Sequence, residues 1–283
     1  MKEIKIKCPA KINLTLEIVN KREDGFHNIK SIMQLINLYD FLKISIDIAK
    51  SNKIILSGNS TEIPYDERNL VYKACDLYLK SAGIRNVEIK IDIDKHIPIS
   101  AGLAGGSTDA AGTIYGLNKL FNVFDDKAIS DLCAKLGSDL NVCLNGGCVL
   151  ATSRGEITEP LPVISKNVTL IKPKNLGISA KEAYTKYAIK TEKPQNNMTE
   201  KMLNALQNDE DIEQFLYNDL EYAIFDDYPE LQLIKQTYPN AIMSGSGSTY
   251  FVFNKTERLL PEKDYLFLNN LKFINEGVSE FVI

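Results

Sequence analysis

The sequence predicts an α+β protein of two domains, and three observations lead to that prediction. Residues 4–18 alternate apolar and polar side chains with a period of two, which is typical of β-strands. Strand-like and helical segments then follow one another without the strict alternation of a βαβ protein. Finally, two prolines fall within residues 159–162, where they remove backbone donors and favour extended chain. We therefore expect one domain over residues 1–160 and a second over residues 161–283.

The individual elements follow from their patterns. Asn69 is a candidate N-cap for a helix with Leu70, Ala74 and Leu77 on one face, and residues 87–93 form a clean alternating strand. Further strands are expected at 30–38, 41–48, 167–172, 240–243 and 249–253. Further helices are expected at about 107–120, 126–136, 180–189, 198–206, 211–217 and 229–237.

Composition narrows the class of protein. With 44% hydrophobic and 25% charged residues, the 283-residue chain is typical of globular proteins. A net charge of −4 is a poor match for a nucleic-acid partner, although a local basic patch is compatible with that total. Five cysteines without a C-x-x-C pair, and only two histidines, favour reduced thiols over a zinc site. We find no signal peptide and no apolar run of membrane-spanning length, and expect a soluble cytoplasmic protein without a membrane partner.

Residues 97–111, IPISAGLAGGSTDAA, carry the main functional signal. Gly102, Gly105 and Gly106 allow a tight turn with inward-pointing N–H groups, and Ser107 or Thr108 can cap the helix that follows. Free N–H groups and the positive end of a helix dipole together form an anion site. Glycines alone are equally typical of a flexible turn, and the spacing fits neither a P-loop nor a Rossmann motif. The order strand, proline, glycine-rich loop, Ser-Thr and alanine-rich helix favours phosphate binding.

This segment resembles the phosphate-binding motif P-x-x-x-G-L-G-G-G-S-S-x-A-A of the galactokinase–homoserine kinase–mevalonate kinase superfamily. Ala104 replaces the middle glycine and Thr108 the second serine. Residues 9–14 (PAKINL) and 21–27 (KREDGFH) are similar to the opening of the diphosphocytidyl methylerythritol kinases, and the D-G-F-H element is the most specific sign. Residues 136–140 resemble the family's G-[AS]-D-V-P segment, with Asn141 in place of proline, and residues 243–248 match the third superfamily motif.

The resemblance implies a fold, a reaction and a set of partners. It implies an N-terminal domain like ribosomal protein S5 domain 2, a ferredoxin-like C-terminal domain, and an active site between them. The expected reaction is ATP-dependent phosphorylation of the 2-hydroxyl of a cytidine diphosphate methylerythritol in the non-mevalonate isoprenoid pathway, with Mg²⁺ accompanying the nucleotide. Other kinases of the superfamily, of homoserine or mevalonate type, and a non-catalytic nucleotide-binding protein are the alternatives.

The resemblance also assigns residues. It makes Asp139 the catalytic carboxylate and Lys11 its neighbour, which favours the ionised carboxylate or the forming alkoxide; the sequence leaves open which effect matters more. Taken alone, Asp139 is typical of a turn or cap, and Lys11 of a solvated strand face. The expected substrate contacts are Asn13, Phe26, His27 and Tyr184, with the cytosine between the two aromatic rings. The expected ATP contacts are Asn69, Leu70, Val71, Lys95, Pro98, Ala101, Gly102, Leu103, Ala104, Gly105, Gly106, Ser107 and Thr108. No protein ligand for the metal is assigned, and Ser107 and Thr108 are only candidates.

Overall fold

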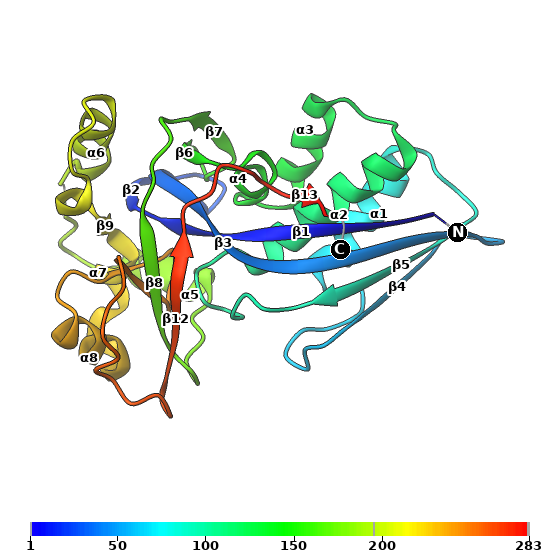
Figure 1. Cartoon of the computed structure of the whole chain (residues 1–283). Coiled ribbons are helices and arrows are strands. Elements are labelled where there is room, and N and C mark those ends of the chain that lie inside the picture. The colour runs from blue at the N-terminus through cyan, green and yellow to red at the C-terminus, as the bar shows by residue number, and fades with distance from the viewer. Residues whose placement is uncertain (1, 195, 282–283) are drawn as a thin grey trace.

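The computed structural model describes residues 2–194 and 196–281, which form two antiparallel-rich sheets with helices packed on them. The larger sheet has the order β13-β1-β3-β2-β9, and β5–β4 and β6–β7 branch from β3. In Figure 1, β1 and β3 run side by side across the molecule. Its strands are β1 (Lys2–Asn13), β2 (Thr15–Lys21), β3 (His27–Ile48), β4 (Lys53–Gly58), β5 (Val87–Asp94), β6 (Cys148–Thr152), β7 (Ile157–Pro160), β9 (Tyr217–Asn218) and β13 (Ser279–Glu280).

The smaller sheet crosses one end of the larger one (Figure 1). It has the order β10-β11-β8-β12, with β8 (Asn167–Pro173), β10 (Ile242–Met243), β11 (Tyr250–Phe253) and β12 (Tyr265–Lys272). Two pairings cross residue 160: β9 joins β2 and β13 joins β1, so the C-terminal part of the chain returns to the larger sheet. The domain limits 1–160 and 161–283 stay a prediction.

The helices divide by the core in which they pack. Four of them cover the larger sheet and share a core with β1, β3 and β5, namely α1 (Leu70–Ser81), α2 (Gly105–Phe121), α3 (Asp126–Leu136) and α4 (Leu140–Asn145). Three more share a core with the smaller sheet, namely α5 (Ala180–Ile189), α7 (Asp219–Ile224) and α8 (Pro229–Thr237). The last, α6 (Met198–Gln207), packs in the core between the two sheets.

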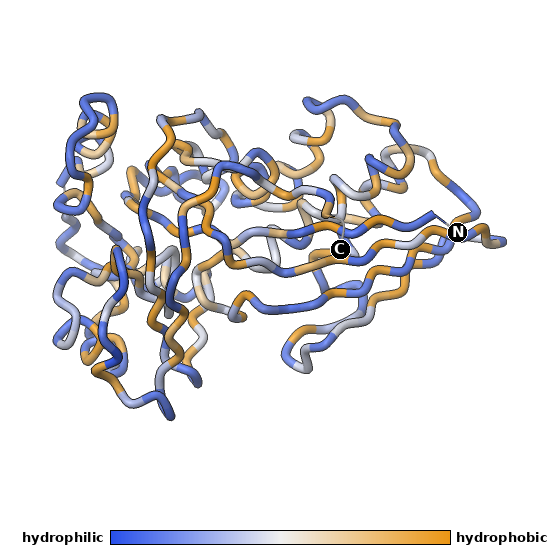
Figure 2. The backbone as a smooth tube through the Cα atoms, viewed as in Figure 1, coloured by the Kyte–Doolittle hydropathy of each residue, from blue (hydrophilic) through white to orange (hydrophobic). Residues whose placement is uncertain are grey.

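A further hydrophobic core lies between the two sheets, and it positions the glycine-rich loop. Ile12 and Leu14, at the end of β1, pack in one cluster with Leu103 of the loop and with Leu170 and Phe251 of the smaller sheet. Figure 2 shows hydrophobic and hydrophilic residues alternating along the long strands of the larger sheet. The loop is therefore held where the two sheets meet.

Most predicted elements are confirmed, and the differences have clear causes. The strands expected at 30–38 and 41–48 are one continuous strand, β3, because β1 pairs with it from Met33 to Ile46, across the expected break at residues 39–40. The helix expected at 211–217 is wrong: residues 213–215 form a single 3-10 turn and Tyr217 begins β9. Elements that the pattern did not predict include β4, α4, α7 and β12, which are short or lack regular alternation.

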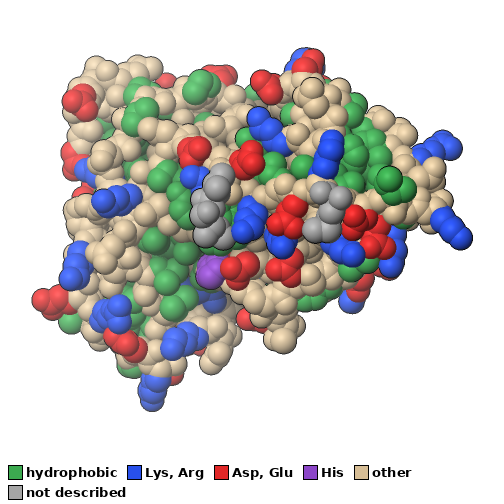
Figure 3. Space-filling view, turned by 45° about the vertical axis from the view of Figure 1, so that its right-hand side comes forward, with side chains coloured by type: hydrophobic (Ala, Val, Ile, Leu, Met, Phe, Trp, Pro, Cys, Tyr) green, Lys and Arg blue, Asp and Glu red, His purple; other side chains and the backbone are tan. Residues whose placement is uncertain are grey.

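The five cysteines are buried and free, as predicted from their spacing. On the face shown in Figure 3, acidic and basic side chains are interspersed rather than gathered by sign. Within the described residues, no helix has both the length and the apolar character needed to cross a membrane.

Candidate active site

The reaction centre predicted from sequence is brought together at the end of β1. Lys11 Nζ lies 3.6 Å from Asp139 Oδ2, although the two residues are far apart in the chain. The Lys11 side chain is buried, whereas the Asp139 side chain is 30% exposed and can meet a substrate. Asp139 occupies the N-cap position of α4, but its side chain makes no capping hydrogen bond. The carboxylate is therefore available for chemistry rather than committed to the helix.

Short-range hydrogen bonds fix the Lys11 ammonium in place. It donates to Asn13 Oδ1 at 2.7 Å and to the carbonyl of Gly102 at 3.3 Å. Asn13 in turn donates from Nδ2 to Ser31 Oγ at 2.8 Å. Lys11 and Asn13 are two residues apart on β1, so their side chains point to the same face of the sheet. A buried lysine with these partners is not the solvated strand lysine that local pattern alone would favour.

The glycine-rich loop makes a tight turn and packs against residues 244–247. Gly102 has φ +74°, and a Cβ at that position would lie 2.0 Å from the carbonyl oxygen of Ser244. The Ser244 hydroxyl donates to the Gly102 carbonyl at 3.0 Å, and Gly245 approaches Lys11 Nζ. The third motif, residues 243–248, therefore packs directly on the loop, as its match to the superfamily implies.

The helix after the loop begins earlier than predicted. Ser107 or Thr108 was expected at the cap, but α2 starts at Gly105 and its N-cap is Ala104. Ala104 takes the left-handed conformation, φ +60°, and supplies no side-chain capping bond. Ser107 and Thr108 thus lie in the first turn, where Ser107 is half-buried and Thr108 fully buried. The N–H groups of this turn are left for an anion.

A cavity of about 520 Å³ opens between residues 95–99, residues 59–62 and the smaller sheet, and none of the predicted contacts in residues 101–108 lines it. Of the predicted ATP contacts, Lys95 and Pro98 line it, together with residues 59–62, His96, Ile97, Ile99, Lys172, Lys174 and Leu266. Asn69, Leu70 and Val71, although predicted as ATP contacts, do not line this cavity. Asn69 instead accepts from the N–H of Val71 at 2.9 Å as the α1 cap, and Val71 is buried in the core.

The Lys95 side chain is buried and pairs with two aspartates. The ammonium donates to Asp109 Oδ2 at 2.8 Å and to Asp40 Oδ2, and all three side chains are buried. Burial raises the pKa of Asp109 to about 7, although the adjacent Lys95 opposes this shift. Burial lowers the pKa of Lys95, but the attraction of Asp109 and Asp40 outweighs it and the pKa is raised. A contact of Lys95 with ATP would therefore come from its backbone.

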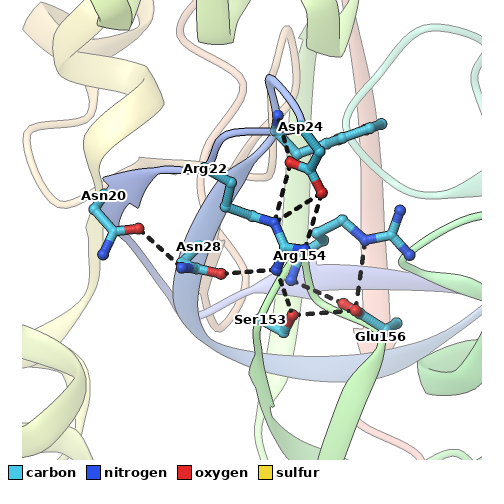
Figure 4. Close-up of polar contacts among 8 residues, drawn as sticks. Asn20, Arg22, Asp24, Asn28, Ser153, Arg154 and Glu156 are labelled. Atoms are coloured by element: carbon cyan, nitrogen blue, oxygen red, sulfur yellow. Dashed lines mark hydrogen bonds and ion pairs between the residues drawn. The ribbon is translucent and has the colours of Figure 1, made fainter.

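The loop between β2 and β3 carries Phe26, whose side chain is 54% exposed. The Arg154 guanidinium lies 5.2 Å from the centre of the Phe26 ring, in cation–π range. Figure 4 shows how polar contacts tie this loop to the turn between β6 and β7. Arg22 donates to Asp24 and, at 3.2 Å, to Ser153 Oγ, and Glu156 accepts from the backbone N–H of Arg154 at 2.8 Å.

His27 and Tyr184 form a stacked pair, with ring centres 5.2 Å apart and an angle of 18° between planes. Tyr187 packs edge-on against the same His27 ring. His27 and Tyr187 also line a second, smaller cavity of about 120 Å³. Burial, with Lys21 and Lys193 nearby, lowers the pKa of His27, so the ring is neutral at pH 7 and one of its nitrogens can accept a hydrogen bond.

Several residues of this region were not found from the sequence. Arg154, Tyr187 and Asp40 lie far along the chain from the residues they contact, and Asp109, though within the phosphate motif, was not singled out. For Asp109, its position directly after Ser-Thr in the phosphate motif was the one available signal.

A β-sheet end that holds a lysine–carboxylate pair beside a glycine-rich anion loop defines a small-molecule kinase, and comparisons with known proteins agree. The model of the GHMP kinases N terminal domain matches residues 69–150. The 4-diphosphocytidyl-2-C-methyl-D-erythritol kinase of Clostridium perfringens (strain SM101 / Type A) is 40% identical over 261 residues, covering 88% of each chain. This chain belongs to the 4-diphosphocytidyl-2-C-methyl-D-erythritol kinase family.

Solved structures extend the comparison to the fold. A crystal structure of 4-(cytidine 5'-diphospho)-2C-methyl-D-erythritol kinase superposes with a TM-score of 0.71 and 29% identity, covering 89% of this chain and 90% of that one. Homoserine kinase from Cytophaga hutchinsonii superposes with a TM-score of 0.76 at 18% identity, covering 99% and 98%. The second likeness shows the shared fold alone.

Proposed function

We propose that this kinase transfers the γ-phosphoryl group of ATP to the 2-hydroxyl of 4-diphosphocytidyl-2-C-methyl-D-erythritol, a step of the non-mevalonate route to isoprenoid precursors. The observation that carries the mechanism is the Lys11–Asp139 pair, 3.6 Å apart, beside the Gly102 carbonyl of the anion loop. In the proposed complex, a proton acceptor and a fixed positive charge would lie next to the ATP phosphates.

The roles of the two residues follow from the chemistry of the transfer. As the acceptor oxygen bonds to phosphorus, its proton passes to Asp139, and the bond from phosphorus to the bridging oxygen breaks to release ADP. Lys11 is fixed by Asn13 and the Gly102 carbonyl, so its charge is preorganised beside the forming oxyanion. Asn13 shares this face of β1, but its side chain is buried and its amide is bonded to Lys11 and Ser31, so its expected contact with the substrate stays a prediction.

For ATP, the proposed site runs from the first turn of α2 into the 520 Å³ cavity. The phosphates would meet the N–H groups of residues 101–107, and the adenosine would lie against the backbone of Lys95 to Pro98. Within the described residues, no group of three or more His, Cys, Asp or Glu side chains could hold a metal ion. Mg²⁺ in kinases usually binds through the substrate phosphates; here the half-buried Ser107 hydroxyl is a protein group that fits, and the ion would neutralise phosphate charge.

For the acceptor, the proposed base site lies around Phe26, His27 and Tyr184. The exposed Phe26 ring offers one stacking face, and the neutral His27 ring can hydrogen-bond the base edge. In this structure one face of Tyr184 is covered by His27, so a cytosine between Phe26 and Tyr184 requires the His27 ring to turn away. Arg154, with its guanidinium over Phe26, extends the same wall.

The two-sheet architecture also fits the finer assignment. We propose an N-terminal domain of the ribosomal protein S5 domain 2 type over residues 1–160, a ferredoxin-like domain over residues 161–283, and a reaction centre where they meet. The core between the sheets, which holds both Leu103 of the loop and Leu170 of β8, supports this placement.

The direct test is the consumption of ATP with and without the cytidine substrate. We expect ADP and a singly phosphorylated product in the presence of 4-diphosphocytidyl-2-C-methyl-D-erythritol, with the new phosphate at the 2-position by ³¹P and ¹H NMR. Turnover with homoserine or mevalonate instead would identify another acceptor within the superfamily. Tight ATP binding without turnover of any of the three would identify a non-catalytic nucleotide-binding protein.

A further inference from the structure

Beneath the anion loop, three charged side chains from three different elements are buried together. Asp40 comes from β3, Lys95 follows the end of β5, and Asp109 comes from α2. Lys95 Nζ contacts a carboxylate oxygen of each aspartate. The proposed chemistry uses none of these three side chains.

Each member of the cluster holds a different part of the nucleotide site. Asp40 Oδ1 accepts from the backbone N–H of His96 at 2.6 Å and of Ile97 at 2.8 Å, and both of these residues line the 520 Å³ cavity. Asp109 lies one turn into α2, whose first turn has no side-chain cap. Lys95 bridges the two, and a Cβ on Gly105 would approach its ammonium to 3.1 Å.

Burying these charged groups has a high desolvation cost if their only role is to stabilise the fold. Burying charges costs several kcal/mol per ion after relaxation, and apolar residues of similar volume often stabilise a fold as well or better. Two carboxyl groups also share a single ammonium here. What the cluster provides, and apolar packing does not, is directional contact between a backbone segment, a loop and a helix start.

We propose that Asp109 is a positioning residue that acts through Lys95 and Asp40 to hold the first turn of α2 in register with the adenosine wall at His96 and Ile97. This inference rests on the proposed ATP site. It makes Lys95 a bridge between the phosphate and adenosine halves of that site rather than a side-chain ligand of the nucleotide.

The test uses two ligands: ADP, which occupies both the phosphate and the adenosine half of the site, and adenosine, which occupies only the adenosine half. Dissociation constants are measured for ADP with Mg²⁺ by calorimetry and for adenosine by NMR titration. Asp109→Ala removes the bridge but leaves a neutral Lys95–Asp40 pair, so the chain should fold. We expect the ADP constant to rise about tenfold, the usual effect of losing one charge-assisted hydrogen bond. The adenosine constant should change less than about twofold, because Asp40 still holds the wall.

Three comparisons make the test decisive. Asp109→Asn keeps an acceptor for Lys95 and should recover part of the ADP affinity. Asp131→Ala, which removes an exposed partner of Lys127 on α3, is the matched control and should change neither constant. In a Lys95→Met background, Asp109→Ala should have no further effect on ADP.

The outcomes distinguish this inference from the proposed function. The positioning role would be overturned if Asp109→Ala weakened the binding of ADP and adenosine equally, or did not weaken ADP binding. This single variant suffices even if Lys95→Met does not fold. If the unmodified chain binds ADP but does not phosphorylate the cytidine substrate, only the proposed acceptor is wrong. If the unmodified chain binds neither ADP nor adenosine, both the ATP site and this inference are wrong.

Discussion

The two sides of the candidate active site are built in opposite ways. On the loop side, Gly102 packs on Ser244 without room for a Cβ, and Lys95 is buried between two carboxylates. On the other side, Phe26 is more than half exposed and the Arg22–Asp24 pair that shapes its loop lies at the surface. A tightly packed side couples binding to stability, whereas an exposed side lets side chains change with little cost to the fold.

The largest expected effect lies where the two sides meet. Asp139→Asn should lower kcat by roughly a hundred- to ten-thousandfold, the usual contribution of a general base. ATP affinity should persist, because the carboxylate is not placed on the nucleotide. Steady-state kinetics and ATP titration check both statements, and a variant that keeps a third or more of the original kcat would remove Asp139 from the proton transfer.

The loop side should respond next. In Gly102→Ala the new Cβ meets the Ser244 carbonyl at 2.0 Å in a backbone conformation that disfavours L-residues, which should cost about 2–4 kcal/mol of unfolding free energy. The KM for ATP should rise together with that loss.

Gly83→Ala is the matched control for this substitution. Gly83 also has positive φ, but an added Cβ there meets nothing within 4 Å. It should therefore cost only about 1 kcal/mol and leave the KM for ATP unchanged. Equal losses in the two variants would mean that the contact with Ser244 is unimportant.

The exposed side should show affinity changes without stability changes. Phe26→Ala should raise the KM for the cytidine substrate about five- to 150-fold, which corresponds to about 1–3 kcal/mol of base stacking. Its melting temperature should stay close to that of the unmodified chain, because the ring is 54% exposed. A lower melting temperature with parallel changes for both substrates would make Phe26 a structural residue.

The sequence predicted the residues proposed for the reaction better than the buried residues that hold them in place. Lys11 and Asp139 were assigned through the resemblance of their short motifs to the family, and the loop through the order of its own residues. The partners of Lys95 were not, because Asp40 is 55 residues away and reaches it through the pairing of β3 with β5. Local pattern does not encode which strands pair. The start of α2 was misplaced for a related reason: alanine at a left-handed N-cap is rare, and propensity favours Ser107.

The smallest expected effect concerns that same alanine. Ala104→Gly relieves the left-handed conformation, which costs an L-residue about 1–2 kcal/mol, but glycine also gains entropy in the unfolded chain. The net gain in unfolding free energy should be at most about 1 kcal/mol, measurable by denaturant titration. A loss of stability would show that the Ala104 methyl group makes packing contacts that outweigh the strain.

The most direct test of this contrast is to measure both KM values, for ATP and for 4-diphosphocytidyl-2-C-methyl-D-erythritol, on Gly102→Ala and Phe26→Ala side by side. Two sides that bind two different substrates predict a crossed pattern: Gly102→Ala raises the KM for ATP alone, and Phe26→Ala raises the KM for the cytidine substrate alone. Parallel increases of both KM values in either variant would contradict the assignment of the two sides to separate substrates.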